Sequence, residues 1–334
     1  KDVARETMTS AGVPITLGSN GTIKNIDEAV KVANNIGYPV IIKATAGGGG
    51  KGIRIAQNEQ ELLEGIRITQ QEAKAAFGDP NVYLEKFITD FRHIEVQILG
   101  DNYGNVIHLG ERDCTIQRRL QKLVEETPSP GINNKMREKL ADISIKAARA
   151  VEYSGAGTIE FIYDLQEQKF YFMEMNTRIQ VEHPVTEMVT NIDIVKEQIR
   201  IASGEKLRYR QEDISFTGWA IECRINAENP NKNFMPSPGI IKTFLPPGGG
   251  GVRVDSAVYS GYTISPYYDS MVAKVITVGE NRQEAVDRMK RALNEFLITG
   301  VETTIPFHLN LLNHETFVSG NFNTRFLDLY NLTT

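Results

Sequence analysis

A glutamate lies inside the apolar run Phe170–Met175, and this feature most constrains how the chain can fold. The aromatic and apolar residues predict a β-strand whose successive side chains point to opposite faces. Glu174 then shares a face with Phe170 and Phe172. Because a carboxylate is costly to bury without a partner, this face indicates either a functional site or a buried ion-pair cluster. The charged, Pro-containing run 177–187 that follows is predicted to be a loop.

Composition excludes several classes of protein. A length of 334 residues is enough for two or three domains. A net charge of -5 argues against non-specific binding to nucleic acid or to an anionic membrane. Cys114 and Cys223 lie far apart without metal-ligand spacing, and no apolar run could span a membrane. We therefore expect a cytoplasmic protein. The first ten residues do not resemble a signal peptide and contain no initiator Met.

The pattern of elements predicts an α+β fold with mainly antiparallel sheets. Helices are expected at 1–11, 27–36, 59–77, 134–153, 192–202 and 282–296, with a helical tail from Pro306. Strands are expected at 40–44, 53–56, 82–88, 94–99, 106–110, 158–163, 170–175, 219–227, 240–244, 252–259 and 271–278.

A run of four glycines, Gly47–Gly50, separates the first two strands and is followed by Lys51. Glycines let backbone N–H groups approach phosphate oxygens closely. A strand follows the run where a dinucleotide fingerprint requires a helix, and Gly52 stands where a P-loop has Ser or Thr. The alternatives are a flap over phosphates and a plain mobile hairpin. The entropy cost of four glycines favours the flap.

Glu160 and Glu174 are expected to face one another across a hairpin centred near Glu167, with Asn176 two residues on. Like charges at opposed positions destabilise a strand pair. A divalent cation with oxygen ligands would remove that cost, and Mg²⁺ or Mn²⁺ suits carboxylates. The alternative is a pair of glutamates on a solvated face.

Three further patterns are ambiguous alone. The charged runs 111–113 and 117–122 would usually be solvated. The strand 220–226 places Glu222, Arg224 and Asn226 on one face, which is either part of a site or the polar outer face of a sheet. His93 and His183 would each most often be structural.

Together these motifs resemble the biotin carboxylase component of biotin-dependent carboxylases, in the ATP-grasp superfamily. The likeness runs from Lys1 to about Leu329 and is carried by the segments IIKATAGGGGKG, EKFITDFRHIEVQ, ERDCTIQRR, GTIEF, EMNTRIQVEHPVTE, ECRINAE and YYDSMVAK. Thr177 in NTR makes it more similar to the acyl-CoA carboxylase branch than to pyruvate carboxylases, where a proline is expected.

The resemblance implies an ATP-grasp fold with a small lid domain carrying the glycine flap and a larger antiparallel, β-rich C-terminal domain. The implied boundaries are a linker helix at 1–13, the lid at 14–88 and the catalytic domain at 89–334. The implied ATP-binding residues are Lys1, Lys43, Gly47, Gly48, Gly49, Gly50, Glu85, Lys86, Ile88, His93, Gln117, Ile162 and Met173, and the implied ligands of Mg²⁺ or Mn²⁺ are Glu160, Glu174 and Asn176.

For the reaction, the resemblance implies that Glu182 is the general base for bicarbonate and that Arg224 stabilises the biotin enolate. Lys122 and Arg178 complete the implied catalytic group. The implied contacts to bicarbonate and biotin are Lys122, Arg178, Gln180, Val181, Arg224 and Asp269. The expected activity is ATP- and bicarbonate-dependent carboxylation of biotin through carboxyphosphate, the first half-reaction of acetyl-CoA (acyl-CoA) carboxylase in fatty-acid synthesis.

The implied partners are a biotin carboxyl carrier protein and a carboxyltransferase. The chain departs from the family at Leu120, where a histidine is expected, and lacks the family's N-terminal Rossmann-like domain, with which a homodimer would be expected. Two rival functions remain: another ATP-grasp carboxylate–amine ligase, or a nucleotide-binding fragment without turnover. The ligase has no need of VEHP or of Arg224.

Overall fold

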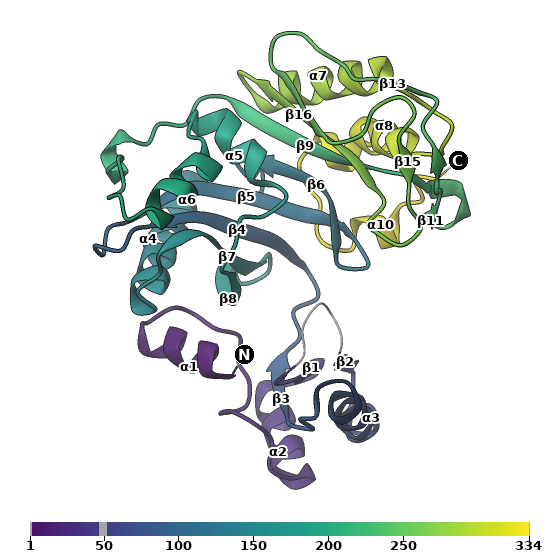
Figure 1. Cartoon of the computed structure of the whole chain (residues 1–334). Coiled ribbons are helices and arrows are strands. Elements are labelled where there is room, and N and C mark those ends of the chain that lie inside the picture. The colour runs from purple at the N-terminus through teal and green to yellow at the C-terminus, as the bar shows by residue number, and fades with distance from the viewer. Residues whose placement is uncertain (1, 47–51, 334) are drawn as a thin grey trace. The chain divides into compact units, whose positions relative to one another are not determined.

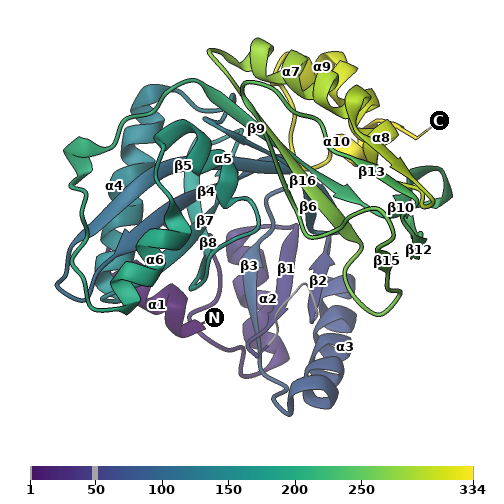
Figure 2. The same cartoon turned by 45° about the horizontal axis from the view of Figure 1, so that its top comes forward.

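The computed structural model describes residues 2–46 and 52–333, which form two compact units. The first unit comprises Lys1–Phe91, Arg149–Val151 and Glu160–Glu174, and the second comprises the rest of the chain. Figures 1 and 2 give two views of the same ribbon. Each unit is described by itself below.

The first unit contains a three-stranded antiparallel sheet in the order β2-β1-β3. Its strands are β1 (Val40–Ala44), β2 (Ile53–Ala56) and β3 (Val82–Lys86), and its helices are α1 (Asp2–Ser10), α2 (Ile26–Ile36) and α3 (Glu59–Phe77). Alternate residues of β1 are buried and pack with apolar residues of α2 and α3 in one core. The sequence predicted these elements, although β3 ends two residues before Ile88.

An eight-stranded sheet dominates the second unit, in the order β14-β16-β9-β6-β5-β4-β7-β8. Its strands are β4 (Phe91–Gly100), β5 (Val106–Arg118), β6 (Gln121–Thr127), β7 (Gly155–Asp164), β8 (Lys169–Asn176), β9 (Trp219–Asn226), β14 (Val252–Ser256) and β16 (Met271–Gly279). The paired strands among β4, β5, β6, β9, β14 and β16 run antiparallel, as predicted. The end of β7 and most of β8 belong to the first unit.

Helices and short strand pairs complete the second unit (Figure 1). The helices are α4 (Asn134–Ala150), α5 (His183–Thr190), α6 (Ile194–Ala202), α7 (Arg282–Glu295), α8 (Ile305–Asn313), α9 (Glu315–Val318) and α10 (Phe326–Leu329), with 3₁₀ turns at Gln211–Asp213 and Pro230–Lys232. The short strands are β10 (Glu228–Asn229), β11 (Met235–Pro236), β12 (Gly239–Ile240), β13 (Thr243–Leu245), β15 (Thr263–Ile264) and β17 (Leu297–Thr299).

The two faces of β9 carry different chemistry. Ile221, Cys223 and Ile225 belong to the large core that also contains the apolar side of α7. Ala220, on the opposite face, packs with Val185 and other residues of α5. Because side chains alternate along a strand, Glu222 and Arg224 share the face that looks toward α5. The strand thus places polar groups beside the start of that helix.

Three sequence expectations were wrong. The strand expected at 106–110 continues to Arg118 and returns as β6, which was not predicted because its charged residues suggested a solvated loop. The loop expected at 177–187 includes the start of α5, where Pro184 occupies the first turn, a position that tolerates proline. The strand expected at 240–244 is instead two short strands, β12 and β13, each with a different partner.

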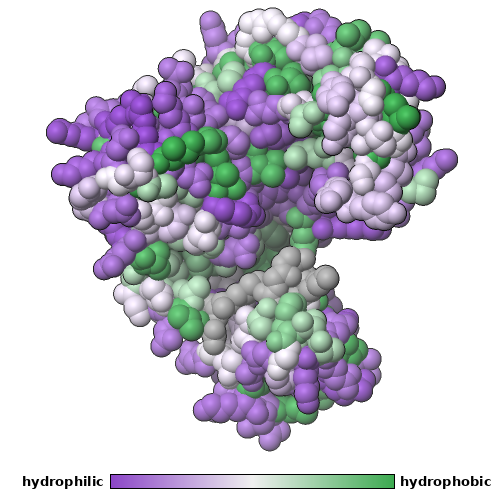
Figure 3. Space-filling model, in the orientation of Figure 1, coloured by the Kyte–Doolittle hydropathy of each residue, from purple (hydrophilic) through white to green (hydrophobic). Residues whose placement is uncertain are grey.

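None of the helices within 2–46 and 52–333 is both long and apolar enough to cross a membrane. The face drawn in Figure 3 is mostly hydrophilic, with smaller hydrophobic areas between. Large exposed apolar side chains include Leu120, Tyr267 and Tyr268.

The N-cap of α3 gives a direct test of the local structure. The side chain of Asn58 accepts a hydrogen bond from the Glu61 N–H at 3.0 Å. Asn58→Ala leaves that N–H without its partner, so we expect the free energy of unfolding of this unit to fall by about 1 kcal/mol. Gln60→Ala, at an exposed position of the same turn, is the control and should change it by less than about 0.5 kcal/mol. Denaturant titration followed by circular dichroism measures both, and equal effects would contradict the capping role.

Candidate functional site

Oppositely charged side chains alternate in a buried chain across the second unit. Arg112 Nε donates to Glu95 Oε1 at 2.6 Å, and Lys122 Nζ lies 2.5 Å from Glu95 Oε2. The same Lys122 ammonium donates to Glu182 Oε1 at 2.6 Å. Arg224 Nη2 donates to the other oxygen of Glu182 at 2.9 Å. Glu182 therefore lies between two cations, each of which touches one of its oxygens.

The elements of the fold set this order of charges. Glu95 lies on β4, Arg112 on β5, Lys122 on β6 and Arg224 on β9, and these strands are consecutive across the sheet in the order β9-β6-β5-β4. Glu182 is the N-cap residue of α5, which packs against the same face. Neighbouring strands lie about 5 Å apart, so side chains that share a face can touch.

Arg112 anchors one end of the chain from a fully buried position. Its Nη1 donates to Gln97 Oε1 at 2.8 Å and to Thr186 Oγ1 at 3.0 Å, while Nη2 donates to Thr158 Oγ1 at 3.1 Å. A buried guanidinium needs such partners because an unpaired charge is expensive in the interior. The contact with Thr186 also ties α5 to the sheet.

The charges shift the pKa of Glu182 strongly. Burial on its own would raise the pKa, but the ammonium of Lys122 and the guanidinium groups of Arg224 and Arg112 outweigh it and lower the pKa to about 2. The carboxylate is therefore ionised at neutral pH. Burial on its own would lower the pKa of Arg224, but the carboxylates of Glu125 and Glu182 outweigh it and raise the pKa, so this guanidinium stays cationic.

In the first unit, Glu85 binds two cations. Lys43 Nζ donates to Glu85 Oε2 at 2.9 Å, and Arg5 Nη1 lies 2.9 Å from Oε1. Thr16 Oγ1 donates to Oε2 at 2.8 Å. The register of β1 against β3 places Lys43 two positions along from the partner of Glu85, on the same face. This arrangement orients the ammonium of Lys43 at the end of the strand that leads into the glycine tract.

The residues after Glu85 line a cavity of about 250 Å³ within the first unit. Lys86 and Ile88, two of the residues expected to bind ATP, are part of its wall, and Lys86 Nζ donates to the carbonyls of Gly37 and Tyr38 at 3.0 and 2.8 Å. Ile162 on β7 and Met173 on β8 are both half-buried and are not among the lining residues.

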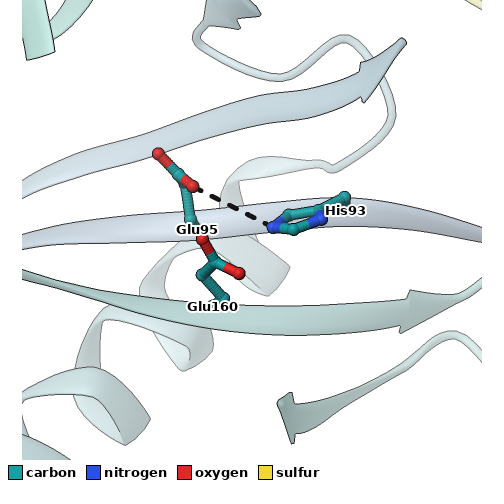
Figure 4. Close-up of side chains that lie close together, drawn as sticks. All are labelled: His93, Glu95 and Glu160. Atoms are coloured by element: carbon teal, nitrogen blue, oxygen red, sulfur yellow. Dashed lines mark ion pairs between the residues drawn. The ribbon is translucent and has the colours of Figure 1, made fainter. Parts of the chain in front are cut away.

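His93 and Gln117, both expected near the ribose, are in contact, with Gln117 Nε2 2.9 Å from His93 Nδ1. His93 Nε2 also lies 4.0 Å from Glu95 Oε2 (Figure 4). The figure draws these two side chains together with Glu160, which comes from β7 of the same sheet.

The expected metal ligands lie on neighbouring strands: Glu160 is buried on β7, and Glu174 and Asn176 are half-buried on β8. The neighbouring strands confirm the predicted hairpin. Carboxylate and amide oxygens are the donors that Mg²⁺ and Mn²⁺ prefer, so these side chains fit such an ion.

The remaining predicted residues surround the charge chain less closely. Val181 precedes Glu182, and its carbonyl accepts from Lys274 Nζ at 2.8 Å. Gln180 is buried, whereas Arg178 is exposed and donates to the Ile179 carbonyl. Asp269 is exposed and accepts from the Met271 N–H. Lys1 and Gly47, Gly48, Gly49 and Gly50 lie outside the described residues.

Two groups of polar residues whose surroundings the sequence left open are buried in the structure. Glu111, Arg112 and Asp113 are buried in β5, although a charge run of this kind is usually solvated. The face of β9 that carries Glu222 and Arg224 is likewise buried and not a polar outer face. Each of these charged side chains has a partner on another element, except Glu222, which lies beside the carboxylate of Glu125 on the neighbouring strand. Neither arrangement can be recognised from the sequence of one strand alone.

Sequence reasoning also missed Glu95 and Glu125. Arg224 Nε donates to Glu125 Oε1 at 2.7 Å, and Glu95 holds both Arg112 and Lys122. A signal existed for Glu95, since it occupies an alternating strand whose other residues are mostly apolar. Glu125 lies on β6, the strand that was not predicted.

Two family models match the chain. The model for the ATP-binding domain of the carbamoyl-phosphate synthase L chain matches residues 1–210, and the model for the biotin carboxylase C-terminal domain matches residues 222–329. Biotin carboxylase 1 of Bacillus subtilis is 71% identical over 99% of this chain and 74% of its own length. Biotin carboxylase of Nostoc is 56% identical over the same shares. Biotin carboxylase of Pseudomonas aeruginosa is 54% identical over 97% of this chain and 72% of its own length.

Solved structures agree with these relatives. The Campylobacter jejuni biotin carboxylase in complex with β,γ-ATP has a TM-score of 0.95 and 48% identity, covering 98% of this chain and 73% of that one. The biotin carboxylase domain dimer of the Hydrogenobacter thermophilus 2-oxoglutarate carboxylase, in complex with MgADP, ADP and bicarbonate, has a TM-score of 0.93 and 54% identity, covering 98% and 72%. The charge chain, the fold and the matches over nearly the whole chain lead to one conclusion: this chain belongs to the biotin carboxylase family of the ATP-grasp superfamily.

Proposed function

We propose that this chain carboxylates biotin, using ATP and bicarbonate. The observation that carries the proposal is the position of Glu182 between Lys122 and Arg224, at 2.6 and 2.9 Å. Bicarbonate is an anion with an acidic proton, so it needs cations to bind it and a carboxylate to receive that proton. The three side chains provide both in one place.

Glu182 must become more basic when substrate binds. A pKa of about 2 makes it a weak base at neutral pH, because Lys122 and Arg224 stabilise its ionised form. A bicarbonate ion that draws these two cations to its own oxygens weakens that stabilisation and raises the pKa of the carboxylate. Binding of the substrate thereby prepares the base that will accept its proton.

In the first step, a bicarbonate oxygen attacks the γ-phosphorus of ATP while the bond to ADP breaks, and Glu182 accepts the bicarbonate proton. The product, carboxyphosphate, divides into CO₂ and phosphate. That phosphate removes the proton from the ureido nitrogen of biotin, and the resulting enolate attacks CO₂ to form carboxybiotin. The guanidinium of Arg224, held on β9 by Glu125, stabilises the enolate oxygen.

The residues expected to bind the nucleotide are proposed to act as follows. Lys43, oriented by Glu85 at 2.9 Å, would donate to phosphate oxygens, and the glycines at 47–50 would cover them. Glu85, Lys86, Ile88, Ile162 and Met173 are proposed for the adenine, and His93 and Gln117 for the ribose side. Glu160, Glu174 and Asn176 would ligate Mg²⁺ or Mn²⁺, which neutralises charge on the transferring phosphoryl group.

Arg178, Gln180 and Val181 are proposed to complete the bicarbonate pocket with Lys122, and Asp269 to contact biotin. The partners proposed are a biotin carboxyl carrier protein and a carboxyltransferase of the acyl-CoA type, and the assembly proposed is a homodimer when the N-terminal domain is present. Cys114 and Cys223 are both free and buried, which fits a reducing compartment, and we propose the cytoplasm.

Loss of the base tests the reaction directly. For Glu182→Gln and Arg224→Ala we expect bicarbonate- and biotin-dependent ADP release to fall by about 10²-fold or more, because each removes a group that acts in the transition state. The exposed variants Glu302→Gln and Arg149→Ala are the matched controls and should keep the wild-type rate. The assay supplies ATP, Mg²⁺, bicarbonate and free biotin.

Two outcomes of that assay would overturn the proposal. Turnover by wild-type protein that responds to another carboxylate and an amine, with biotin inert, would identify a different ATP-grasp ligase. Nucleotide binding without any turnover would identify a binding fragment.

Removal of Lys43 tests the nucleotide role. Lys43→Met deletes a charge-assisted hydrogen bond to phosphate, so the dissociation constant for MgADP should rise by about tenfold or more. Lys31→Met, an exposed lysine of α2 in the same unit, is the control. Isothermal titration calorimetry measures both, and equal affinities for the two variants would exclude a phosphate contact by Lys43.

The shifted pKa of Glu182 predicts a stability change with a defined pH dependence. Because the pKa in the folded protein lies below the ordinary value of 4.5, the ionised carboxylate stabilises the fold above pH 4.5, and this contribution is lost as the pH falls toward about 2. Glu182→Gln should therefore lower the free energy of unfolding by about 3 kcal/mol at neutral pH, with a smaller deficit in acid. Urea titrations across pH measure the difference, which a constant deficit would contradict.

A further inference from the structure

A further carboxylate, that of Glu222, lies next to the row of alternating charges. Glu222 on β9 is the direct partner of Glu125 on β6 in the antiparallel register, so their side chains share a face. Both side chains are fully buried. Glu125 Oε1 accepts from Arg224, whereas Glu125 Oε2 and both oxygens of Glu222 have no hydrogen-bond partner within residues 2–46 and 52–333.

Two ionised carboxylates in this position would be unfavourable. Like charges at opposed positions of a strand pair repel, and burial removes the water that would screen them. The alternating chain already balances three cations, Arg112, Lys122 and Arg224, with the three carboxylates of Glu95, Glu182 and Glu125. A negative charge on Glu222 would therefore have no cation to balance it.

The other charged groups near Glu222 do not remove the excess. Lys274 on β16 donates to the Val181 carbonyl and lies 3.6 Å from Asp255 of β14. The charged groups that act on Glu222 from its own strand, from the neighbouring strands and from the N-cap of α5 are Arg224, Glu125, Lys274 and Glu182. Arg224 is already bound by two carboxylates, and Lys274 is bound by the Val181 carbonyl and by Asp255.

From this geometry we infer that Glu125 and Glu222 share one proton, so that the pair carries a single negative charge and positions Arg224. The O–H of Glu222 points to Glu125, which keeps its other oxygen for the guanidinium. Glu222 is then a positioning residue that acts on Arg224 through Glu125. This inference deepens the proposed function, because it concerns the arginine assigned to the biotin enolate.

The electrostatics of the site support the shared proton. Burial and the neighbouring Glu125 carboxylate raise the pKa of Glu222 well above its ordinary value. Burial likewise raises the pKa of Glu125 to about 7, although Arg224 acts in the opposite direction. Carboxyl groups that face one another in other proteins titrate as a pair in the same way.

The pH dependence of stability tests the proton without any assay of activity. A folded state that keeps a proton on the pair loses stability as the pH rises above 4.5, since the unfolded chain releases that proton. Glu222→Gln is neutral at every pH and avoids this loss. Its midpoint of thermal unfolding, relative to wild type, should therefore increase as the pH is raised from about 5 to about 7.

Glu197→Gln is the matched control, a buried glutamate on α6 that pairs with Arg200 and Arg208. It should show no such gain with rising pH. A relative midpoint for Glu222→Gln that stays constant or falls with pH would overturn the shared proton.

The positioning role is tested by conservative rescue. Glu222→Ala removes the group that holds Glu125, and displacement of a catalytic group by about 1 Å can cost about 10²-fold in rate. We expect a loss of about tenfold or more in biotin-dependent kcat for Glu222→Ala, and recovery of most of it in Glu222→Gln, whose amide donates to Glu125. Equal losses in the two variants would overturn the role. A wild-type protein without biotin-dependent turnover would instead overturn the proposed function, while the stability comparison would still decide whether the proton is shared.

Discussion

The pairing of Glu182 with Lys122 and Arg224 is the interaction on which the site depends. A carboxylate buried to this degree stays ionised only if cations outweigh the cost of its lost hydration. The two cations are themselves almost buried, so each needs a second carboxylate, Glu95 for one and Glu125 for the other. In this row of alternating buried charges, removing any one charge leaves a neighbouring charge without one of its partners.

Strand register and the start of one helix bring these alternating charges together. Arg224 is fixed at both its side chain and its backbone, because its carbonyl accepts from His308 Nε2 at 2.8 Å and from Thr304 Oγ1 at 3.2 Å. Burial lowers the pKa of His308 to about 4, so this imidazole is neutral and donates from one nitrogen. The start of α8 therefore holds the strand from one face while Glu125 and Glu182 hold the guanidinium on the other. Such rigidity suits the role proposed for Arg224, which is to stabilise negative charge as it develops on the biotin enolate.

The sequence predicted much of this arrangement but not which charged residues pair with one another. The helices and strands of the first unit and the strand carrying Arg224 followed from periodicity and caps, because these signals are local. Glu182, Lys122 and Arg224 came from a resemblance of motifs. Glu95, Glu125 and the buried position of Arg112 did not come from either source. Their partners lie 15 to 99 positions away in the chain, and only the order of strands in the sheet brings them together. β6 was missed because its charges, taken one strand at a time, suggested solvent.

The proposed attack on ATP by bicarbonate held at Glu182 is tested most directly by an oxygen label. Wild-type protein would be supplied with ATP, Mg²⁺, biotin and bicarbonate labelled with oxygen-18, and the released phosphate would be examined by mass spectrometry. If carboxyphosphate forms and then divides, an oxygen of bicarbonate stays on phosphorus, so we expect labelled phosphate. Labelled phosphate should also appear at the same rate as ADP. Phosphate that carries only unlabelled oxygen during biotin-dependent turnover would contradict the formation of carboxyphosphate from bicarbonate.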